Sequence, residues 1–145
     1  MKDKIYAEIV QYAKEIRMPS TVRCFEDEIR MAEVKNKSYA EFFHSILQKE
    51  YDQRKENGKK NRIRLAGFPA KKYLEDLVVE ELPEDAKKKL AMFKSLDFIK
   101  SGQNIILAGS PGTGKTHISI GLGVKAAMAG YRVIFTTIPL LISSW

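Results

Sequence analysis

Eight residues, Gly109 to Thr116, read Gly-Ser-Pro-Gly-Thr-Gly-Lys-Thr, which matches the composition and spacing of a phosphate-binding loop. Glycines allow the backbone to curl so that several N–H groups converge on one phosphate, and no Cβ blocks the approach of the ligand. In such a loop Lys115 places its ammonium group on the β- and γ-phosphates, and the Thr116 hydroxyl ligates Mg²⁺. The sequence therefore predicts a site for ATP and Mg²⁺.

The segments on either side of the loop have the patterns that such a loop requires. Residues 104–108 are an apolar run typical of a short buried strand, and residues 115–129 have a helical pattern that Gly130 ends. A helix that starts at the loop adds its unpaired N–H groups and its positive dipole end to the anion site. This order of strand, loop and helix makes the alternative, a glycine-rich turn without a ligand, the weaker interpretation. The predicted nucleotide-site residues are Gly109, Ser110, Pro111, Gly112, Thr113, Gly114, Lys115, Thr116 and His117.

The sequence after the loop lacks the acids that ATP hydrolysis normally uses. No Asp or Glu follows Asp97. A P-loop ATPase normally holds Mg²⁺ with an acid at the end of a second strand, and a further polar residue orients the attacking water. We therefore expect this chain to bind ATP rather than hydrolyse it, and we assign no catalytic residue.

The last residues predict an incomplete parallel sheet. Residues 131–136 have the pattern of a second strand, and residues 139–145 that of a helix cut short. A parallel sheet needs several strands and two covered faces. We therefore expect an α/β chain in which an all-α domain, residues 1–72, precedes the first part of a parallel-sheet nucleotide domain, residues 73–145, truncated after its second strand.

The N-terminal part has the periodicity of three amphipathic helices. Pro19 separates the first two, and Ser38 with Glu41 forms a capping box at the start of the third, which is predicted to run past Gly58 and end near Gly67. The third helix is expected to bury Tyr39, Phe42, Phe43, Ile46 and Leu47. Another helix is predicted to begin at Pro83, after an irregular segment with an apolar patch.

Basic side chains are concentrated between residues 54 and 72. The chain has 25 Lys and Arg against 18 Asp and Glu, a net charge of +7, and this segment carries the excess. Such a cluster is typical of nucleic-acid contacts, although charge runs are often only solvated surface. No aromatic residue lies between Tyr51 and Phe68, which favours contacts to a duplex backbone over base stacking. The candidate DNA contacts are Arg54, Lys55, Lys59, Lys60, Arg62, Arg64, Lys71 and Lys72.

Composition is typical of a cytoplasmic protein. No apolar stretch approaches the length of a membrane span, and the N-terminus lacks the pattern of a secretory signal. The single cysteine, Cys24, has no partner for an internal disulfide. We therefore expect a cytoplasmic location and no membrane partner.

Several short motifs together resemble a known family. They are Phe68-Pro69, Leu74-Glu75-Asp76, Leu96-Asp97-Phe98-Ile99, the loop followed by His117, and Ala129-Gly130-Tyr131-Arg132-Val133. In this arrangement the chain resembles the IstB-like transposition helper ATPases, relatives of the DnaC helicase loaders within the AAA+ class. The resemblance extends over nearly the whole chain, and its last motif favours the helper over the loader.

The resemblance implies a function in DNA recombination. It implies a self-associating AAA+ protein that assembles on duplex DNA with ATP and directs a transposase to its target site. It also implies a strand order in which the first two strands of the sheet are not neighbours. The alternatives are a DnaC-like loader whose partner is a replicative helicase, a truncated DNA-binding fragment without ATPase activity, and a small P-loop kinase.

Overall fold

The computed structural model describes residues 1–145, and the chain divides into two compact units, residues 1–57 and 58–145. The division falls inside one long helix, α3 (Tyr39–Ala66). The sequence places its domain boundary after residue 72, and that assignment stays a prediction. None of the helices is both long enough and apolar enough to cross a membrane.

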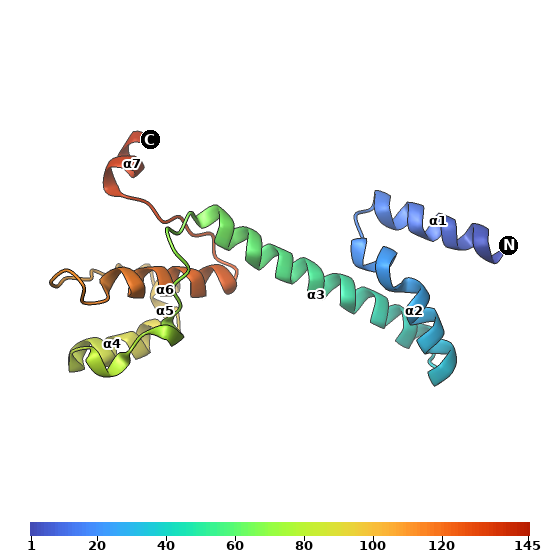
Figure 1. Cartoon of the computed structure of the whole chain (residues 1–145), viewed down its shortest axis with the longest axis horizontal. Helices are drawn as coiled ribbons and strands as arrows, with labels where there is room; N and C mark the ends of the chain where they lie inside the picture. The colour runs from blue at the N-terminus through green and yellow to red at the C-terminus, as the bar shows by residue number, and fades with distance from the viewer. The chain divides into compact units, whose positions relative to one another are not determined.

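Unit 1 is formed by α1 (Lys2–Glu15), α2 (Pro19–Lys35) and the first part of α3 (Figure 1). Pro19 occupies the first turn of α2, where its missing N–H group leaves no helical hydrogen bond unmade. The ring of Tyr6 on α1 packs edge-on against Phe25 on α2, with centroids 5.3 Å apart. Ala13, Phe25 and Ile46 are buried, one from each helix. The three predicted N-terminal helices are therefore confirmed.

The start of α3 has the capping box that the sequence predicts. The Ser38 N–H donates to Glu41 Oε2 at 2.8 Å, and the Glu41 N–H donates to Ser38 Oγ at 3.2 Å. The predicted buried face of this helix is largely wrong, because Tyr39 is 95% exposed and Phe43 is 61% exposed. Only Ile46 of the five predicted core residues is fully buried. The reason is geometric: α2 covers the side of α3 that carries Ile46 and Glu50, and the aromatic stripe four residues apart lies on another side.

Glu50 of α3 caps the N-terminus of α2 from a neighbouring helix. Its side chain is buried, and Oε2 accepts hydrogen bonds from the Thr21 N–H at 2.9 Å and from Thr21 Oγ1 at 3.3 Å. The first N–H groups of a helix have no partner within the helix, so a carboxylate there satisfies them and interacts favourably with the helix dipole. The cap fixes the register between α2 and α3.

Replacing Glu50 by alanine is expected to destabilise the chain by about 1–2 kcal/mol, because the Thr21 N–H loses its acceptor. Urea unfolding followed by circular dichroism measures the change. Glu26, an exposed carboxylate on α2, provides the control, and Glu26→Ala should change stability by less than about 0.5 kcal/mol. Equal effects of the two substitutions would show that Glu50 contributes only its charge.

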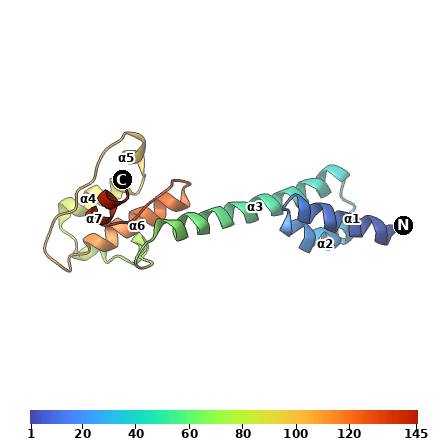
Figure 2. The ribbon, with the colours of Figure 1, turned by 90° about the horizontal axis from the view of Figure 1, so that it is seen from above.

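Unit 2 contains the end of α3 and a series of short elements around one longer helix (Figure 2). Two 3₁₀ turns, η1 (Leu74–Asp76) and η2 (Val79–Glu81), precede α4 (Glu84–Phe93) and α5 (Asp97–Lys100). The central helix is α6 (Lys115–Met128), and α7 (Ile138–Ser143) lies near the C-terminus. The core is formed by Leu74, Leu82, Leu90, Ile118 and Leu122.

Two glycines in the middle of α6 allow the segment after α3 to pack directly on the helix. A Cβ at Gly121 would lie 2.7 Å from Leu74 Cδ2 and 3.1 Å from the Leu74 backbone nitrogen. A Cβ at Gly123 would lie 2.7 Å from the Phe68 ring. Glycine disfavours a helix interior, so close packing is the physical reason for it at both positions. Residues 68–74 are thereby held against α6.

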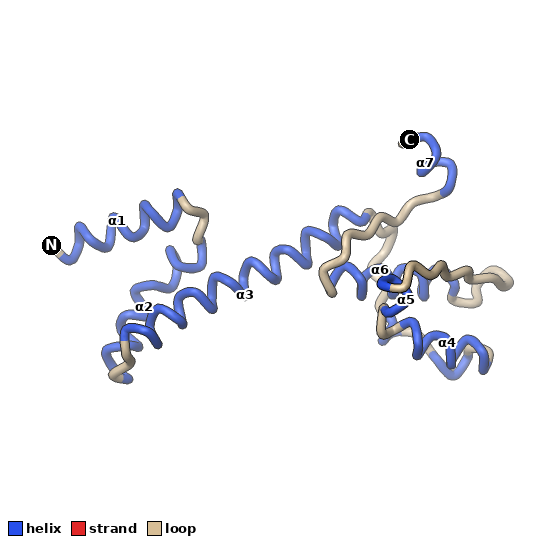
Figure 3. The backbone as a smooth tube through the Cα atoms, turned by 180° about the vertical axis from the view of Figure 1, so that it is seen from behind, coloured by secondary structure: helices blue, strands red, loops and turns tan.

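The predicted parallel sheet is wrong for this structure. Figure 3 shows helices and loops and no strand, and residues 104–108 and 131–136 are both irregular. A strand needs a neighbour to complete its ladder, and these two segments do not pair with each other. Ile106 is 90% exposed and Ile134 is 78% exposed, so each segment also lacks cover on at least one face. The predicted helices around them are confirmed as α4, α6 and α7.

Candidate nucleotide-binding site

The loop from Gly109 to Thr116 curls through two glycines whose backbone conformation other residues rarely adopt. Gly112 and Gly114 have φ values of +80° and +90°, in the left-handed region that other residues avoid. A Cβ at Gly109 would lie 3.1 Å from Thr113 Oγ1, which itself donates to the Ser110 carbonyl at 2.7 Å. Helix α6 begins directly after Gly114, so its free N–H groups end at the loop. These residues fit a polyphosphate.

Lys115 holds its ammonium group over the loop itself. Nζ donates to the Ser110 carbonyl at 2.7 Å and also to the Gly109 carbonyl. Both acceptors are neutral, whereas hydrogen bonds between an ammonium and a phosphate oxygen are charge-assisted and about twice as strong. Lys115 is therefore placed at the loop in a position from which it can exchange carbonyl acceptors for phosphate oxygens.

A cavity of about 930 Å³ extends from the loop to the segment before it in sequence. That volume lies within the usual range for small-molecule sites, roughly 300–1,000 Å³. One wall consists of residues 104–109, Gly112 to Lys115, His117 and Ile118, and the facing wall comes from residues 76–93, which include parts of η1, η2 and α4. The two walls meet where Leu77 packs against Gly114, because Leu77 Cδ1 lies 3.6 Å from the position that a Cβ on Gly114 would occupy. The facing wall is mostly apolar, with Leu77, Val78, Leu82, Pro83, Ala86, Leu90 and Phe93.

Acidic residues from upstream line the same cavity. Asp76, Glu81 and Asp85 belong to the facing wall, although all three precede the loop in sequence. No three His, Cys, Asp or Glu side chains come together at metal-binding distance in the chain. The preference for ATP binding over hydrolysis stays a prediction.

His117 contacts the facing wall. Its Nε2 lies 2.6 Å from the Tyr73 carbonyl oxygen, immediately before η1, and its side chain is half-buried. Sequence alone places His117 beside the loop but gives no role for the imidazole. The structure gives it a partner 44 residues away in the sequence.

The arginines of the basic segment have partners within the protein. Arg54 donates to the Arg17 carbonyl at 2.6 Å in unit 1. In unit 2 the half-buried Arg62 donates from Nε at 2.7 Å to the Ala127 carbonyl near the end of α6, and the same carbonyl also accepts the Gly130 N–H at 3.2 Å. Arg64 donates to Asn61 Oδ1 at 2.7 Å. Arg54 and Arg62 therefore have structural contacts that sequence could not reveal.

The lysines of the segment are mostly exposed. Lys55 lies over the Tyr51 ring, with Nζ 5.4 Å from the centroid, and Lys59 is half-buried. Lys60, Lys71 and Lys72 are exposed, the last two in the loop after α3. Lys60 and Arg64 are four residues apart on one side of α3, whereas Lys55 and Lys59 lie on another. The basic side chains of α3 in unit 2 therefore lie on more than one side of the helix.

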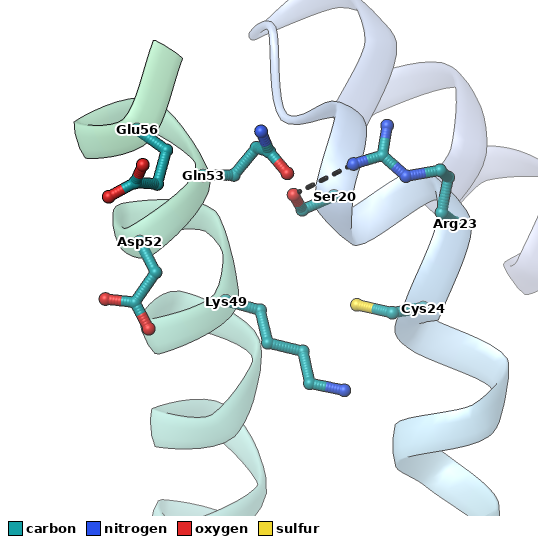
Figure 4. Close-up of a pocket in the computed structure, with 7 residues that line it drawn as sticks. All are labelled: Ser20, Arg23, Cys24, Lys49, Asp52, Gln53 and Glu56. Atoms are coloured by element: carbon teal, nitrogen blue, oxygen red, sulfur yellow. Dashed lines mark hydrogen bonds between the residues drawn. The ribbon is translucent and has the colours of Figure 1, made fainter. Parts of the chain in front are cut away.

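A smaller cavity of about 390 Å³ lies in unit 1 between α2 and α3, as Figure 4 shows. Arg23 donates to Ser20 across its edge at 3.3 Å. Burial raises the pKa of Cys24, which keeps its thiol protonated at neutral pH. The hydrogen bond from Lys49 to Glu28 raises the pKa of Lys49. The cavity is lined by side chains of both charges, and its one thiol is not activated as a nucleophile.

Comparison with known proteins decides the family. The profile of the family described as IstB-like ATP binding protein matches residues 11–144. The chain belongs to the IstB-like ATP-binding protein family. Its match begins within α1 and includes the loop, both walls of the cavity and the basic segment.

Individual IstB-like relatives are bacterial proteins of insertion sequences. The chain is 37% identical over 82% of its length to an IS21 ATP-binding protein of Pseudomonas aeruginosa, and this covers 45% of that protein. It is 27% identical over 94% of its length to an IS5376 ATP-binding protein of Geobacillus stearothermophilus, covering 53% of it. An IS21-like ATP-binding protein of Bacteroides fragilis is 29% identical over 94% of the chain and is covered to 52%. The chain spans about half the length of these relatives.

Sequence reasoning missed the residues that join the two walls. Tyr73 contributes only a backbone carbonyl, which leaves no signature in a sequence. Gly121 and Gly123 were visible, since a glycine inside a helical pattern often marks close packing. These glycines indicate that another segment packs closely on α6, but they do not identify that segment as residues 68–74.

Proposed function

We propose that this IstB-like protein binds ATP with Mg²⁺ at the loop from Gly109 to Thr116 and engages duplex DNA as the helper of an insertion-sequence transposase. The observation that carries the proposal is the glycine cradle with Lys115 folded onto it, open to a cavity large enough for a nucleotide. The names of the relatives, ATP-binding proteins of insertion sequences, support the same function.

Within the site, each group has a distinct part. The N–H groups at the start of α6 and the Lys115 ammonium would bind the phosphates, and the Thr116 hydroxyl would hold Mg²⁺. The metal, when bound, neutralises phosphate charge. The apolar wall around Leu77 and Val78 is the surface against which the nucleoside end packs. Calorimetric titration with Mg-ATP tests this proposal, and the expected result is saturable binding with one site per chain.

Contacts to duplex DNA are proposed for the exposed part of the basic segment. Lys60, Arg64, Lys71 and Lys72 are all exposed, whereas Arg62 is half-buried and holds the end of α6. Phosphate contacts by such side chains are independent of base sequence and depend strongly on salt. The partner transposase and self-association are proposed from the family alone.

Replacing Lys60, Arg64, Lys71 and Lys72 together by alanine is expected to weaken duplex binding and to reduce the slope of log affinity against log salt by up to about 3–4. Each phosphate contact releases about 0.9 of a counterion, so four contacts account for that change. Fluorescence anisotropy of a labelled duplex at several salt concentrations measures it.

The control removes the same charge elsewhere, at the exposed lysines Lys4, Lys35, Lys88 and Lys100. This second variant should retain most of the salt dependence. If both variants lose the same slope, net charge alone explains binding and the segment is only a solvated face.

A further inference from the structure

We infer that His117 is a positioning residue that fixes the nucleoside-side wall of the cavity against the phosphate loop. The inference rests on the proposed function, because it assigns the separate contributions of the two walls to ATP binding. Its starting point is the contact of His117 Nε2 with the Tyr73 carbonyl at 2.6 Å. His117 lies two residues after Lys115 in the first turn of α6, and Tyr73 directly precedes η1.

The chemistry of this contact fixes the direction of the hydrogen bond. A backbone carbonyl only accepts, so Nε2 carries the proton and donates it; this assigns the tautomer from the partner. The same Tyr73 oxygen accepts the Asp76 N–H at 3.2 Å, which is one of the two backbone hydrogen bonds that form η1. A carbonyl oxygen has two lone pairs and accommodates both donors. His117 therefore holds the carbonyl on which the 3₁₀ turn depends.

The turn held in this way contributes Asp76 to the wall of the cavity, and the next residue, Leu77, continues it. Leu74 is buried against Gly121, and Asp76 and Leu77 line the cavity opposite the loop. Leu77 packs beside Gly114, the residue that precedes Lys115. The wall and the loop therefore meet at α6, and the imidazole is the polar link between them.

The two walls contribute separately to ligand affinity. Phosphates bind to the loop, whose N–H groups and Lys115 do not involve Tyr73, whereas the nucleoside lies against η1 and α4. Replacing His117 by alanine is expected to lower the affinity for Mg-ATP about three- to tenfold, the effect of one hydrogen bond. Affinity for Mg-tripolyphosphate, which has no nucleoside, should change less than twofold. Glutamine keeps an N–H donor at similar reach, so His117→Gln should recover most of the ATP affinity.

Calorimetry on the full chain tests these expectations with Mg-ATP and Mg-tripolyphosphate as probes. Ser119→Ala, at an exposed position of α6, is the control and should leave both affinities unchanged. Equal losses for the two probes would show that His117 supports the loop itself. Unchanged ATP affinity in the alanine variant would show that the contact does not affect the site. Failure of the wild-type chain to bind either probe would count against the proposed function.

Hydrogen exchange decides the positioning role without any nucleotide. Loss of the imidazole should increase amide exchange at Asp76 and Leu77, whose N–H groups donate within η1. The glutamine variant should restore protection, and amides in the middle of α6 should be unaffected. If the amides of Asp76 and Leu77 exchange at the same rate in His117→Ala as in the wild-type chain, the inference is wrong, whether or not the chain binds ATP.

Discussion

Replacing Lys115 by alanine is expected to lower the affinity for Mg-ATP by roughly ten- to a hundredfold, because hydrogen bonds to charged groups contribute about 1.5–3 kcal/mol. The effect is large because the ammonium already lies at the loop, held by the Gly109 and Ser110 carbonyls. Little movement is needed for it to reach a phosphate, and the charge-assisted hydrogen bonds that it makes there are about twice as strong as those to the two carbonyls that it gives up. Calorimetry or displacement of a fluorescent ATP analogue measures the change.

The matched control is Lys125→Ala, which removes a lysine from the last turn of the same helix. It should change ATP affinity less than twofold at physiological salt, because screening reduces the effect of charges beyond about 8 Å. Thermal unfolding of both variants shows whether a loss of ATP affinity comes from the missing ammonium group or from unfolding of the chain. Wild-type affinity in a folded Lys115→Ala variant would end the assignment of this loop as the nucleotide site.

Replacing Gly121 by alanine is expected to destabilise unit 2 by about 1–3 kcal/mol. Helix propensity alone predicts the opposite, since alanine is favoured over glycine in a helix interior by about 1 kcal/mol. Overpacking outweighs helix propensity here, because the new Cβ would lie 2.7 Å from Leu74 Cδ2 and 3.1 Å from the Leu74 backbone nitrogen. A backbone atom fixed by η1 cannot move aside as a side chain does. Urea unfolding of the full chain measures the loss.

Gly58 provides a control with the opposite sign. It also lies inside a helix, α3, but a Cβ there would meet only the Nη1 end of the Arg62 side chain, at 3.2 Å. Gly58→Ala should therefore stabilise the chain by about 0.5–1 kcal/mol. If Gly121→Ala also stabilises it, residues 68–74 are not packed on α6 as described.

Helices were predictable from the sequence because their signals are local. The capping box at Ser38, Pro19 in the first turn of α2 and Gly130 after α6 all act within a few residues of the position that they define. Strands depend on a partner elsewhere, so residues 104–108 had the right composition without forming a ladder. The exposure of Tyr39 and Phe43 has the same origin: periodicity identifies an apolar face, and only tertiary packing decides whether it is covered.

The candidate site likewise has one part that local sequence predicts and one part that depends on tertiary packing. The loop is contiguous, so residue types at fixed spacing predict both its position and its glycine backbone. Its facing wall comes from η1, η2 and α4, which the sequence describes as an irregular segment followed by a helix. The contact between His117 and Tyr73 spans 44 residues and uses a backbone atom, so no pattern of residue types predicts it.

The hydrogen bond from Arg62 to the Ala127 carbonyl ties the far end of α6 to α3. Helix α6 has 14 residues and is therefore about 21 Å long, with the candidate nucleotide loop at one end and this arginine at the other. An α-helix resists compression, so a shift of its first turn moves its last turn as well. If the chain binds both ATP and duplex DNA as proposed, thermodynamic reciprocity requires that any change in DNA affinity caused by ATP equals the change in ATP affinity caused by DNA.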